Sequence, residues 1–130
     1  MALAHHDLCF GCGQTNLFGL LLEVDHVDER RVAGRCFIKQ DHQGPDRRFA
    51  HQGLIAAALS EAMALACGPR AHAIALSVEL TADAPVGAFL DVEAAAGECQ
   101  AGTISATATA SSEGRPVAAA QGRFEREHAV

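Results

Sequence analysis

The stretch that decides the fold runs from Phe49 to Cys67 and reads F-A-H-Q-G-L-I-A-A-A-L-S-E-A-M-A-L-A-C. After Gly53 it is apolar on nearly every side of a helix, which is typical of a helix buried inside a protein. Glycine and proline at positions 68 and 69 predict its end. One hydroxyl, Ser60, and one carboxylate, Glu61, lie in its middle. Because burying an ionised carboxylate is costly unless it is paired or hydrogen-bonded, Glu61 needs a partner or a function.

The entrance of this helix is a polar turn made of His51, Gln52 and Gly53. The first N–H groups of a helix have no intrahelical partner, and glycine lets a ligand approach them closely. An anion, or a carbonyl oxygen that gains negative charge, would be stabilised there. A helix entrance lined by donors, with an acid two turns further on, indicates acyl chemistry.

The rest of the chain predicts extended segments and turns around one helix. Residues 20–27 and 31–38 indicate a hairpin, and the polar residues 41–48 indicate a loop that leads to the helix. Three or four further strands are expected, at 73–82, 89–96, 103–111 and 116–125, with a turn at 112–115 between the last two. A chain of 130 residues fits one domain. One buried helix among antiparallel strands gives an α+β layer architecture.

Three ordered motifs carry a resemblance to a known family. The turn His51–Gly53 with its apolar helix is one, C-F-G-C-G-x-x-N-x-x-G-L from Cys9 to Leu20 is the second, and S-V-E-L-T-A-D-A-P-V-G-A-F-L from Ser77 to Leu90 is the third. Together they resemble the hotdog-fold acyl-CoA thioesterases of the PaaI-like branch, over most of the chain. The resemblance implies a single hotdog domain over residues 1–130, with one antiparallel sheet wrapped around the central helix at about 52–67. It also implies a homodimer or homotetramer, with each active site built from the helix entrance of one chain and the mid-helix of another.

For the chemistry, the resemblance implies that the N–H groups of Gln52 and Gly53 polarise a thioester carbonyl. This chain departs from the family pattern at the acid, which usually lies nine residues after the histidine. That position is Ser60 here, and the carboxylate follows at Glu61. One helical residue is a rotation of about 100°, so the two side chains occupy different places. Either Ser60 positions the attacking water while Glu61 acts as general base, or Glu61 is structural, capping a strand or binding an arginine.

Three functions remain open on this pattern. The preferred prediction is an acyl-CoA thioesterase that hydrolyses a small or medium acyl-CoA thioester. The second is a non-catalytic acyl-CoA or acyl-carrier binding protein, in which Ser60 only contacts the acyl group. The third is an enoyl-CoA hydratase-like enzyme, with His51 and Glu61 as its acid and base. No cofactor is expected beyond the coenzyme A of the substrate.

The predicted substrate contacts are His51, Ser77 and a rim of arginines. His51 either contacts the substrate or holds the turn by hydrogen bonds. Ser77 lies on the strand after the helix and either faces the site or faces solvent together with its neighbours on that face. The guanidinium fork suits phosphate oxygens, so the rim can bind the nucleotide part of coenzyme A or remain solvated loop charge. Its members are Arg47, Arg48 and Arg70.

Composition excludes several classes of partner. A net charge of −6 argues against nucleic acid, which favours a basic face. No apolar run is long enough to span a bilayer, so no membrane partner is predicted. The first seven residues lack the design of a signal peptide, which leads us to expect a cytoplasmic protein.

Five cysteines, at positions 9, 12, 36, 67 and 99, are an odd number at irregular spacing and do not predict a disulfide framework. Those at 36, 67 and 99 lie in apolar segments and are expected to be small buried residues. Cys9 and Cys12 form a C-x-x-C motif with His5 and His6 just upstream. Zinc needs four ligands in a closed site, and the chain has no second cysteine pair, so no metal is predicted. The motif is interpreted as a loop before the first strand.

Overall fold

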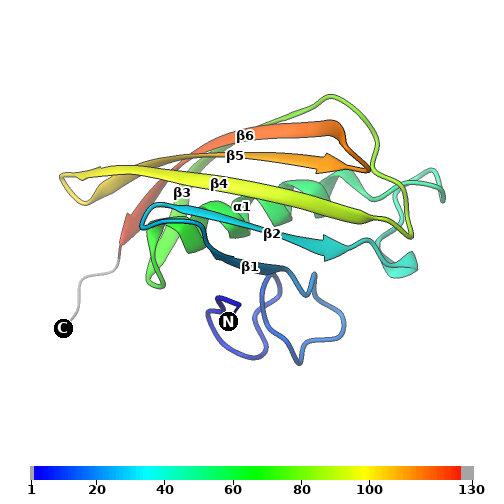
Figure 1. Ribbon diagram of the computed structural model, residues 1–130, viewed down its shortest axis with the longest axis horizontal. Helices are drawn as coiled ribbons and strands as arrows, with labels where there is room; N and C mark the ends of the chain where they lie inside the picture. Colours follow the sequence, from blue (N-terminus) through cyan, green and yellow to red (C-terminus); the bar gives the residue numbers. More distant parts are fainter. Residues whose placement is uncertain (1, 127–130) are drawn as a thin grey trace.

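The computed structural model describes residues 2–126 as one helix packed on one sheet (Figure 1). Six strands form an antiparallel sheet in the order β1-β2-β4-β5-β6-β3, and α1 runs along one face of it. The α+β hotdog architecture expected from the sequence is confirmed. In chain order the elements are β1 (Glu23–His26), β2 (Arg31–Phe37), the 3-10 helix η1 (Gln40–His42), α1 (Gln52–Cys67), β3 (Ala71–Leu80), β4 (Phe89–Gln100), β5 (Thr103–Ser112) and β6 (Arg115–Arg126).

The core lies between α1 and the central strands. Alternate residues of β4 and β5 point toward the helix and are buried, whereas their neighbours face away. Leu59 and Met63 of α1 are fully buried against this surface. Replacing a buried leucine such as Leu59 by alanine would therefore cost about 2–5 kcal/mol of unfolding free energy. In the part of the chain that the structure describes, no helix is long and apolar enough to cross a membrane.

Both ends of α1 are capped by side chains. His51 is the N-cap residue, and its Nδ1 accepts a hydrogen bond of 2.9 Å from the N–H of Gly53. At the other end, Arg126 donates from Nε and Nη2 to the carbonyl oxygen of Cys67, at 2.9 and 2.7 Å. These two hydrogen bonds hold Arg126, the last residue of β6, against the end of α1.

The strands agree with the predicted ones in number and order but differ at some ends. β1 begins at Glu23 instead of Leu20, because Leu21 has a φ of 52° and interrupts the extended segment. β4 continues four residues past Ala96 after a register shift. The hairpin turns are tight because two consecutive residues have positive φ in each, at Ala101-Gly102 (53° and 81°) and Glu113-Gly114 (53° and 78°).

The extended end of β4 explains an incorrect prediction for one cysteine. Cys36 and Cys67 are buried as expected, but Cys99 is exposed. Both faces of β4 are exposed from Gly97 to Gln100, so no layer covers this end of the sheet. The apolar residues near Cys99 in the sequence did not indicate that it is exposed, because burial depends on which element packs over the strand.

The two edges of the sheet differ. β1 is short, and the N–H of Leu3 in the N-terminal segment donates to Val24 at its outer side. β3 has 10 residues, and within residues 2–126 no strand pairs with its outer side. Its residues Leu76, Val78 and Leu80 pair with helix-facing positions of β6, yet Leu76 and Leu80 remain 44% and 39% exposed. The sheet thus ends in a long open edge with uncovered apolar side chains.

Candidate functional site

A cleft of about 250 Å³ opens at the N-terminus of α1. The loop before the helix forms one wall and is held by backbone hydrogen bonds from Ala50 to Ala84 and from His51 to His42, both 2.8 Å. The N-terminal segment supplies the opposite wall through Phe10 and Leu20. The cleft is lined by Phe10, Leu20, Asp41, His42, Gln43, His51, Gly53 and Leu54.

Two backbone N–H groups at the start of α1 already donate hydrogen bonds within the chain. The N–H of Gly53 binds the ring of His51 at 2.9 Å, and the N–H of Leu54 binds the carbonyl oxygen of His51 at 3.0 Å. Gln52 is the first residue of the helix, and its N–H has no partner among residues 2–126. Because Nδ1 of neutral His51 accepts a hydrogen bond, its proton lies on Nε2. His51 therefore caps the helix, and the N–H of Gln52, a residue next to those that line the cleft, is left unpaired among residues 2–126.

The side chain of His42 lies in the same wall and has no hydrogen-bond partner among residues 2–126. Both of its ring nitrogens are shielded from solvent and unpaired, and the backbone of Phe18 approaches the ring without forming a hydrogen bond of standard geometry. Burial lowers the pKa of His42, and the charge of Lys39 lowers it further. The ring is therefore neutral at neutral pH. Sequence analysis treated this residue as part of a polar loop, and only its packing singles it out.

The predicted arginine rim does not form one surface within a chain. Arg47 and Arg48 are exposed beside the helix entrance, and Arg48 is held by Asp46 through bonds of 2.8 and 3.1 Å. Arg70 follows the far end of α1, which is about 24 Å away for a helix of 16 residues. None of the three arginines is among the residues that line the cleft.

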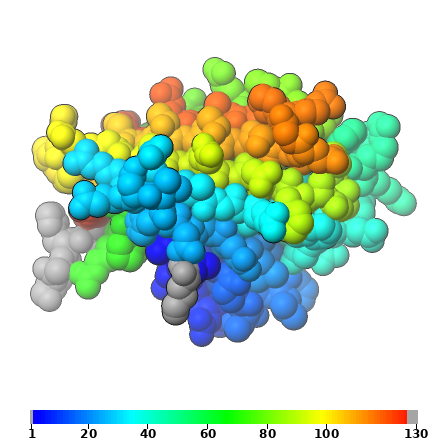
Figure 2. All heavy atoms as spheres, in the orientation of Figure 1, coloured from blue at the N-terminus to red at the C-terminus, as the bar shows by residue number. Residues whose placement is uncertain are grey.

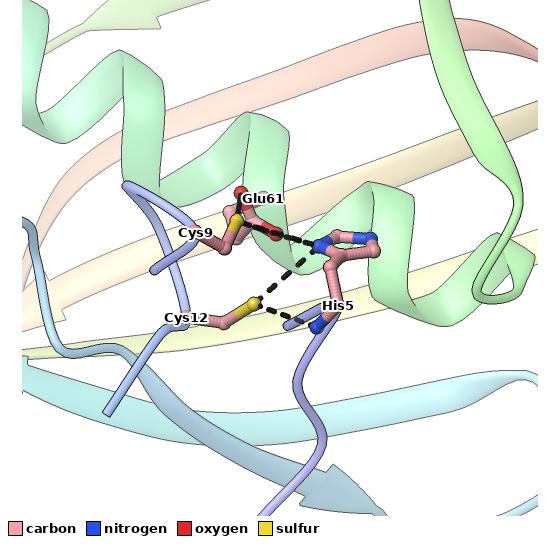
Figure 3. A group of neighbouring side chains, drawn as sticks. All are labelled: His5, Cys9, Cys12 and Glu61. Atoms are coloured by element: carbon pink, nitrogen blue, oxygen red, sulfur yellow. Dashed lines mark hydrogen bonds and ion pairs between the residues drawn. The ribbon is translucent and has the colours of Figure 1, made fainter. Parts of the chain in front are cut away.

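Glu61 points from the middle of α1 into the N-terminal loop (Figure 3). Its Oε1 lies 2.6 Å from Nδ1 of His5, and both of its oxygens lie 3.9 Å from Sγ of Cys9. The hydrogen bond with the Glu61 carboxylate raises the pKa of His5 to about 9, against the opposing effect of burial. Glu61 thus has a cationic partner, which is a histidine and not the arginine considered from the sequence.

The C-F-G-C-G loop is fitted closely around this carboxylate. A Cβ at Gly11 would overlap Oε2 of Glu61, so a larger residue there would displace the Glu61 carboxylate. Burial raises the pKa of the Cys9 thiol, but hydrogen bonds from the backbone of Cys12, the ring of His5 and the backbone of Gly11 bring it below its usual value. Burial raises the pKa of Cys12 to about 12. In the space-filling view the N-terminal segment packs directly against the β1–β2 hairpin (Figure 2).

Ser60 and Ser77 are not brought to the helix entrance within one chain. Ser60 lies on the half-exposed side of α1 together with Ala56, Ala57 and Ala64. Ser77 of β3 pairs with Gln121 of β6. The residues on either side of Gln121 point toward α1, and side chains alternate along a strand, so Gln121 and Ser77 both face away from α1. Ser77 lines a separate hollow of about 650 Å³ on the outer face of the sheet.

Sequence reasoning identified the helix entrance and Glu61 but missed His5 and His42 as members of the site. His5 was noted only as a neighbour of the C-x-x-C motif, 56 positions before Glu61 in the chain. The one signal for it was local: a histidine upstream of two cysteines. Nothing in the sequence indicated that this segment would lie on the middle of α1.

Comparison with known proteins places this fold. No protein-family model matches the sequence. No curated protein matches it either. Among solved structures, Escherichia coli PaaI from the phenylacetic acid degradation operon is 17% identical, with a TM-score of 0.77 over 85% of this chain and 83% of that one. A mutant of the phenylacetic acid degradation protein PaaI from Thermus thermophilus is 25% identical, with a TM-score of 0.73 over 82% and 93%.

A third structure contains a ligand. The protein smu.793 from Streptococcus mutans, bound to acetyl-CoA, is 14% identical, with a TM-score of 0.71 over 82% of this chain and 88% of that one. At these identities the likeness establishes the fold. The chain is a hotdog-fold protein whose structural neighbours are PaaI-like proteins of the thioesterase superfamily.

Proposed function

We propose that this chain is an acyl-CoA thioesterase that acts on a small or medium acyl-CoA thioester as a homo-oligomer. The observation that carries the proposal is the cleft at the N-terminus of α1, which is lined by His51, Gly53 and Leu54, together with the neighbouring N–H of Gln52, which is unpaired among the residues that the structure describes. A helix N-terminus favours negative charge, so it stabilises the oxyanion that forms when water attacks a thioester. The neighbours named as thioesterases, and the one bound to acetyl-CoA, support the same class of substrate.

In this mechanism the thioester carbonyl oxygen accepts a hydrogen bond from the N–H of Gln52. A second bond comes from the N–H of Gly53 once the ring of His51 turns away, or from Nε2 of His51 itself. Arg47 and Arg48 lie beside the entrance and present guanidinium groups to the phosphates of coenzyme A. Water attacks the carbonyl carbon, the tetrahedral intermediate collapses, and the thiol of coenzyme A leaves.

Ser60 is the group we assign to the attacking water. Ser60 and Glu61 both lie on the half-exposed side of α1, but the Glu61 carboxylate is already paired with His5. The helix rises about 12 Å over the eight residues from Gln52 to Ser60, so the two act on one substrate only across a subunit interface. The open edge of β3, with Leu76 and Leu80 uncovered, supports a second copy of the chain as the partner.

A second candidate is a protein that binds acyl-CoA without hydrolysing it. The ion pair between Glu61 and His5 favours this alternative, because it occupies the one carboxylate of α1. An enoyl-CoA hydratase-like enzyme receives less support. Its proposed acid and base, His51 and Glu61, are ten residues apart on one helix, which is about 15 Å along the axis.

The test is hydrolysis of a series of acyl-CoA thioesters, followed by detection of the released thiol, with binding of a non-hydrolysable analogue measured by calorimetry. The proposal expects turnover above the spontaneous rate for at least one small or medium acyl group. Binding without turnover would support the non-catalytic alternative. Absence of both would overturn the assignment to coenzyme A thioesters.

A further inference from the structure

The N-terminal loop and α1 bring four metal-binding side chains together. His5, Cys9 and Cys12 come from the loop and Glu61 from the middle of the helix, and their ligand atoms all lie within 4.8 Å of one another (Figure 3). Among residues 2–126 this is the one such group of histidine, cysteine and acidic side chains that the structure assembles. The proposed thioesterase chemistry at the helix entrance makes no use of it.

The separations fit the edges of a tetrahedron around a zinc ion. With Zn–S of about 2.3 Å, and Zn–N and Zn–O of about 2.1 Å, a tetrahedral site has donor separations of about 3.6 Å between sulfur and nitrogen or oxygen. The distances from Nδ1 of His5 are 3.7 Å to Sγ of Cys9 and 3.4 Å to Sγ of Cys12. Sγ of Cys9 lies 3.9 Å from the Glu61 oxygens. The 2.6 Å ion pair between His5 and Glu61 must widen to about 3.4 Å, and every other pair of ligand atoms lies within 4.8 Å.

The loop around the sulfur atoms has the features of a metal-binding turn. Two residues separate the cysteines, which is within the spacing common among zinc sites. The N–H of His5 donates to Sγ of Cys12 at 3.1 Å. Such outer hydrogen bonds orient ligands and stabilise thiolates. Gly11 leaves room for the Glu61 carboxylate to enter the turn.

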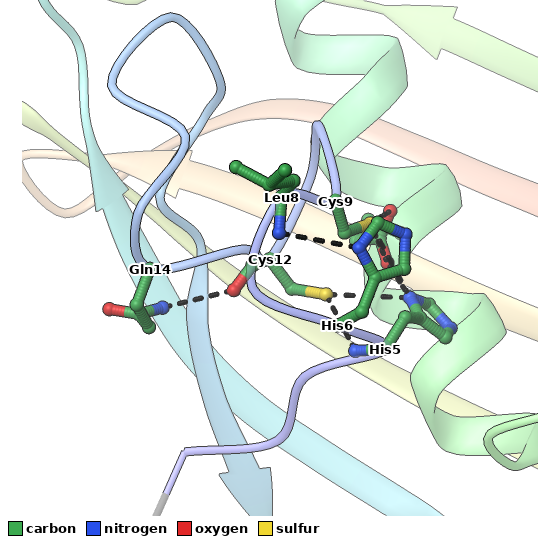
Figure 4. Close-up of polar contacts among 7 residues, drawn as sticks. His5, His6, Leu8, Cys9, Cys12 and Gln14 are labelled. Atoms are coloured by element: carbon green, nitrogen blue, oxygen red, sulfur yellow. Dashed lines mark hydrogen bonds and ion pairs between the residues drawn. The ribbon is translucent and has the colours of Figure 1, made fainter.

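His6 supplies an internal contrast. It neighbours His5 in sequence, but its Nδ1 accepts a hydrogen bond of 3.3 Å from the N–H of Leu8, and it is not part of the cluster (Figure 4). The side chain of Gln14 likewise turns to the carbonyl oxygen of Cys12 and not to its sulfur. The convergence is therefore limited to the four side chains with suitable donor atoms.

We propose that His5, Cys9, Cys12 and Glu61 bind one zinc ion that fastens the N-terminal loop to the middle of α1. Two sulfur donors, one imidazole and one carboxylate are a set that zinc accepts in tetrahedral geometry. As the metal binds, the protons held by His5 and by the two thiols leave to solvent, because the ligands are neutral imidazole, thiolates and carboxylate. Four protein ligands close the coordination shell, so the ion is structural and has no open position for water.

The test begins with the untagged, reduced protein, because a histidine tag would bind metal itself. Zinc is removed with a chelator, restored by dialysis, and counted per chain by mass spectrometry. Cobalt is then added to the metal-free protein. We expect one zinc per chain, and visible cobalt bands of tetrahedral type with a thiolate charge-transfer band in the near ultraviolet.

Variants assign the ligands. Cys9→Ser and Cys12→Ser should each weaken zinc binding by more than about 100-fold. Loss of a residue that only hydrogen-bonds to a zinc ligand costs up to about 100-fold in affinity, and loss of a ligand should cost more. Cys99→Ser, at the exposed cysteine, and His6→Ala should bind as the unchanged protein does, whereas His5→Ala should not. Circular dichroism checks that each variant folds. The cobalt spectrum is recorded on the unchanged protein, so it tests the site even if a variant fails to fold.

The reduced protein would overturn the proposal if it bound less than about a tenth of an equivalent of zinc, or if cobalt gave no thiolate band. Equal zinc binding by Cys12→Ser and Cys99→Ser would overturn it as well. Formation of a Cys9–Cys12 disulfide under reducing conditions, seen as a loss of two mass units, would also exclude the site. None of these outcomes depends on thioester hydrolysis, so the metal site and the proposed enzymatic function fail or stand separately.

Discussion

The proposed mechanism can be tested most directly at the N–H of Gln52. Replacing Gln52 by proline removes this N–H while the helix is expected to remain. Gln52 is the first residue of α1, where proline is well tolerated. The residue before a proline must be extended, and His51 already has φ of −58° and ψ of 135°. Gln52→Pro should therefore keep the helix and lose one donor.

The expected magnitude follows from how the other donors are used. Gly53 and Leu54 already donate to His51, so in the described structure Gln52 supplies the donor that is free for the thioester oxygen. Loss of one oxyanion donor costs about 10²–10³ in kcat, or roughly 2.7–4 kcal/mol of transition-state stabilisation. The bond strengthens as charge develops on the oxygen, so kcat should fall far more than KM rises.

The assay is steady-state thioester hydrolysis by Gln52→Pro and by the control Gln52→Ala, which keeps the N–H and loses the side chain. The alanine variant should remain within a few-fold of the unchanged protein. Thermal unfolding followed by circular dichroism checks that α1 persists in both. If the folded proline variant hydrolyses as fast as the alanine variant, the N–H of Gln52 does not hold the oxyanion.

Four further results are expected. Leu76→Asp should raise the dimer dissociation constant, measured by sedimentation, about 10³-fold. The dimer would cover the 44% of Leu76 that is exposed, and this burial contributes about 2 kcal/mol of binding free energy in each copy. The control Leu17→Asp, in the N-terminal loop, should leave the dissociation constant unchanged. Ser60→Asp should raise hydrolysis if this position handles the attacking water, and a lower rate in the folded variant would contradict that role. Since the pKa of His42 is lowered on folding, the free energy of unfolding should fall as pH drops from about 6.5 through that lowered pKa, and denaturant titrations of His42→Asn should show a flatter pH slope. Zinc at about 100 times its dissociation constant should add about 2.7 kcal/mol and raise the melting temperature by roughly 10 °C, with no such rise in Cys12→Ser.

The central helix and its approximate ends could be predicted from the sequence. Its apolar stretch and its glycine-proline end are local signals, and the structure has α1 at Gln52–Cys67 as expected. The strand order along the chain was also predictable, because period-two patterns and turn residues act over a few positions. The first residue of β1 was not predictable, because a single positive φ at Leu21 interrupts a continuous apolar run.

The site divides in the same way. The sequence by itself placed a donor-lined turn at the start of a buried helix and showed that Glu61 needs a partner. Only tertiary structure decided that the partner is His5, that the ring of His51 occupies the N–H of Gly53, and that His42 is enclosed without a hydrogen bond. Helix propensity, turn chemistry and hydrophobic period are properties of neighbouring residues, whereas burial and ion pairing depend on which distant segment packs against them. For Glu61, that segment begins 56 positions earlier in the chain.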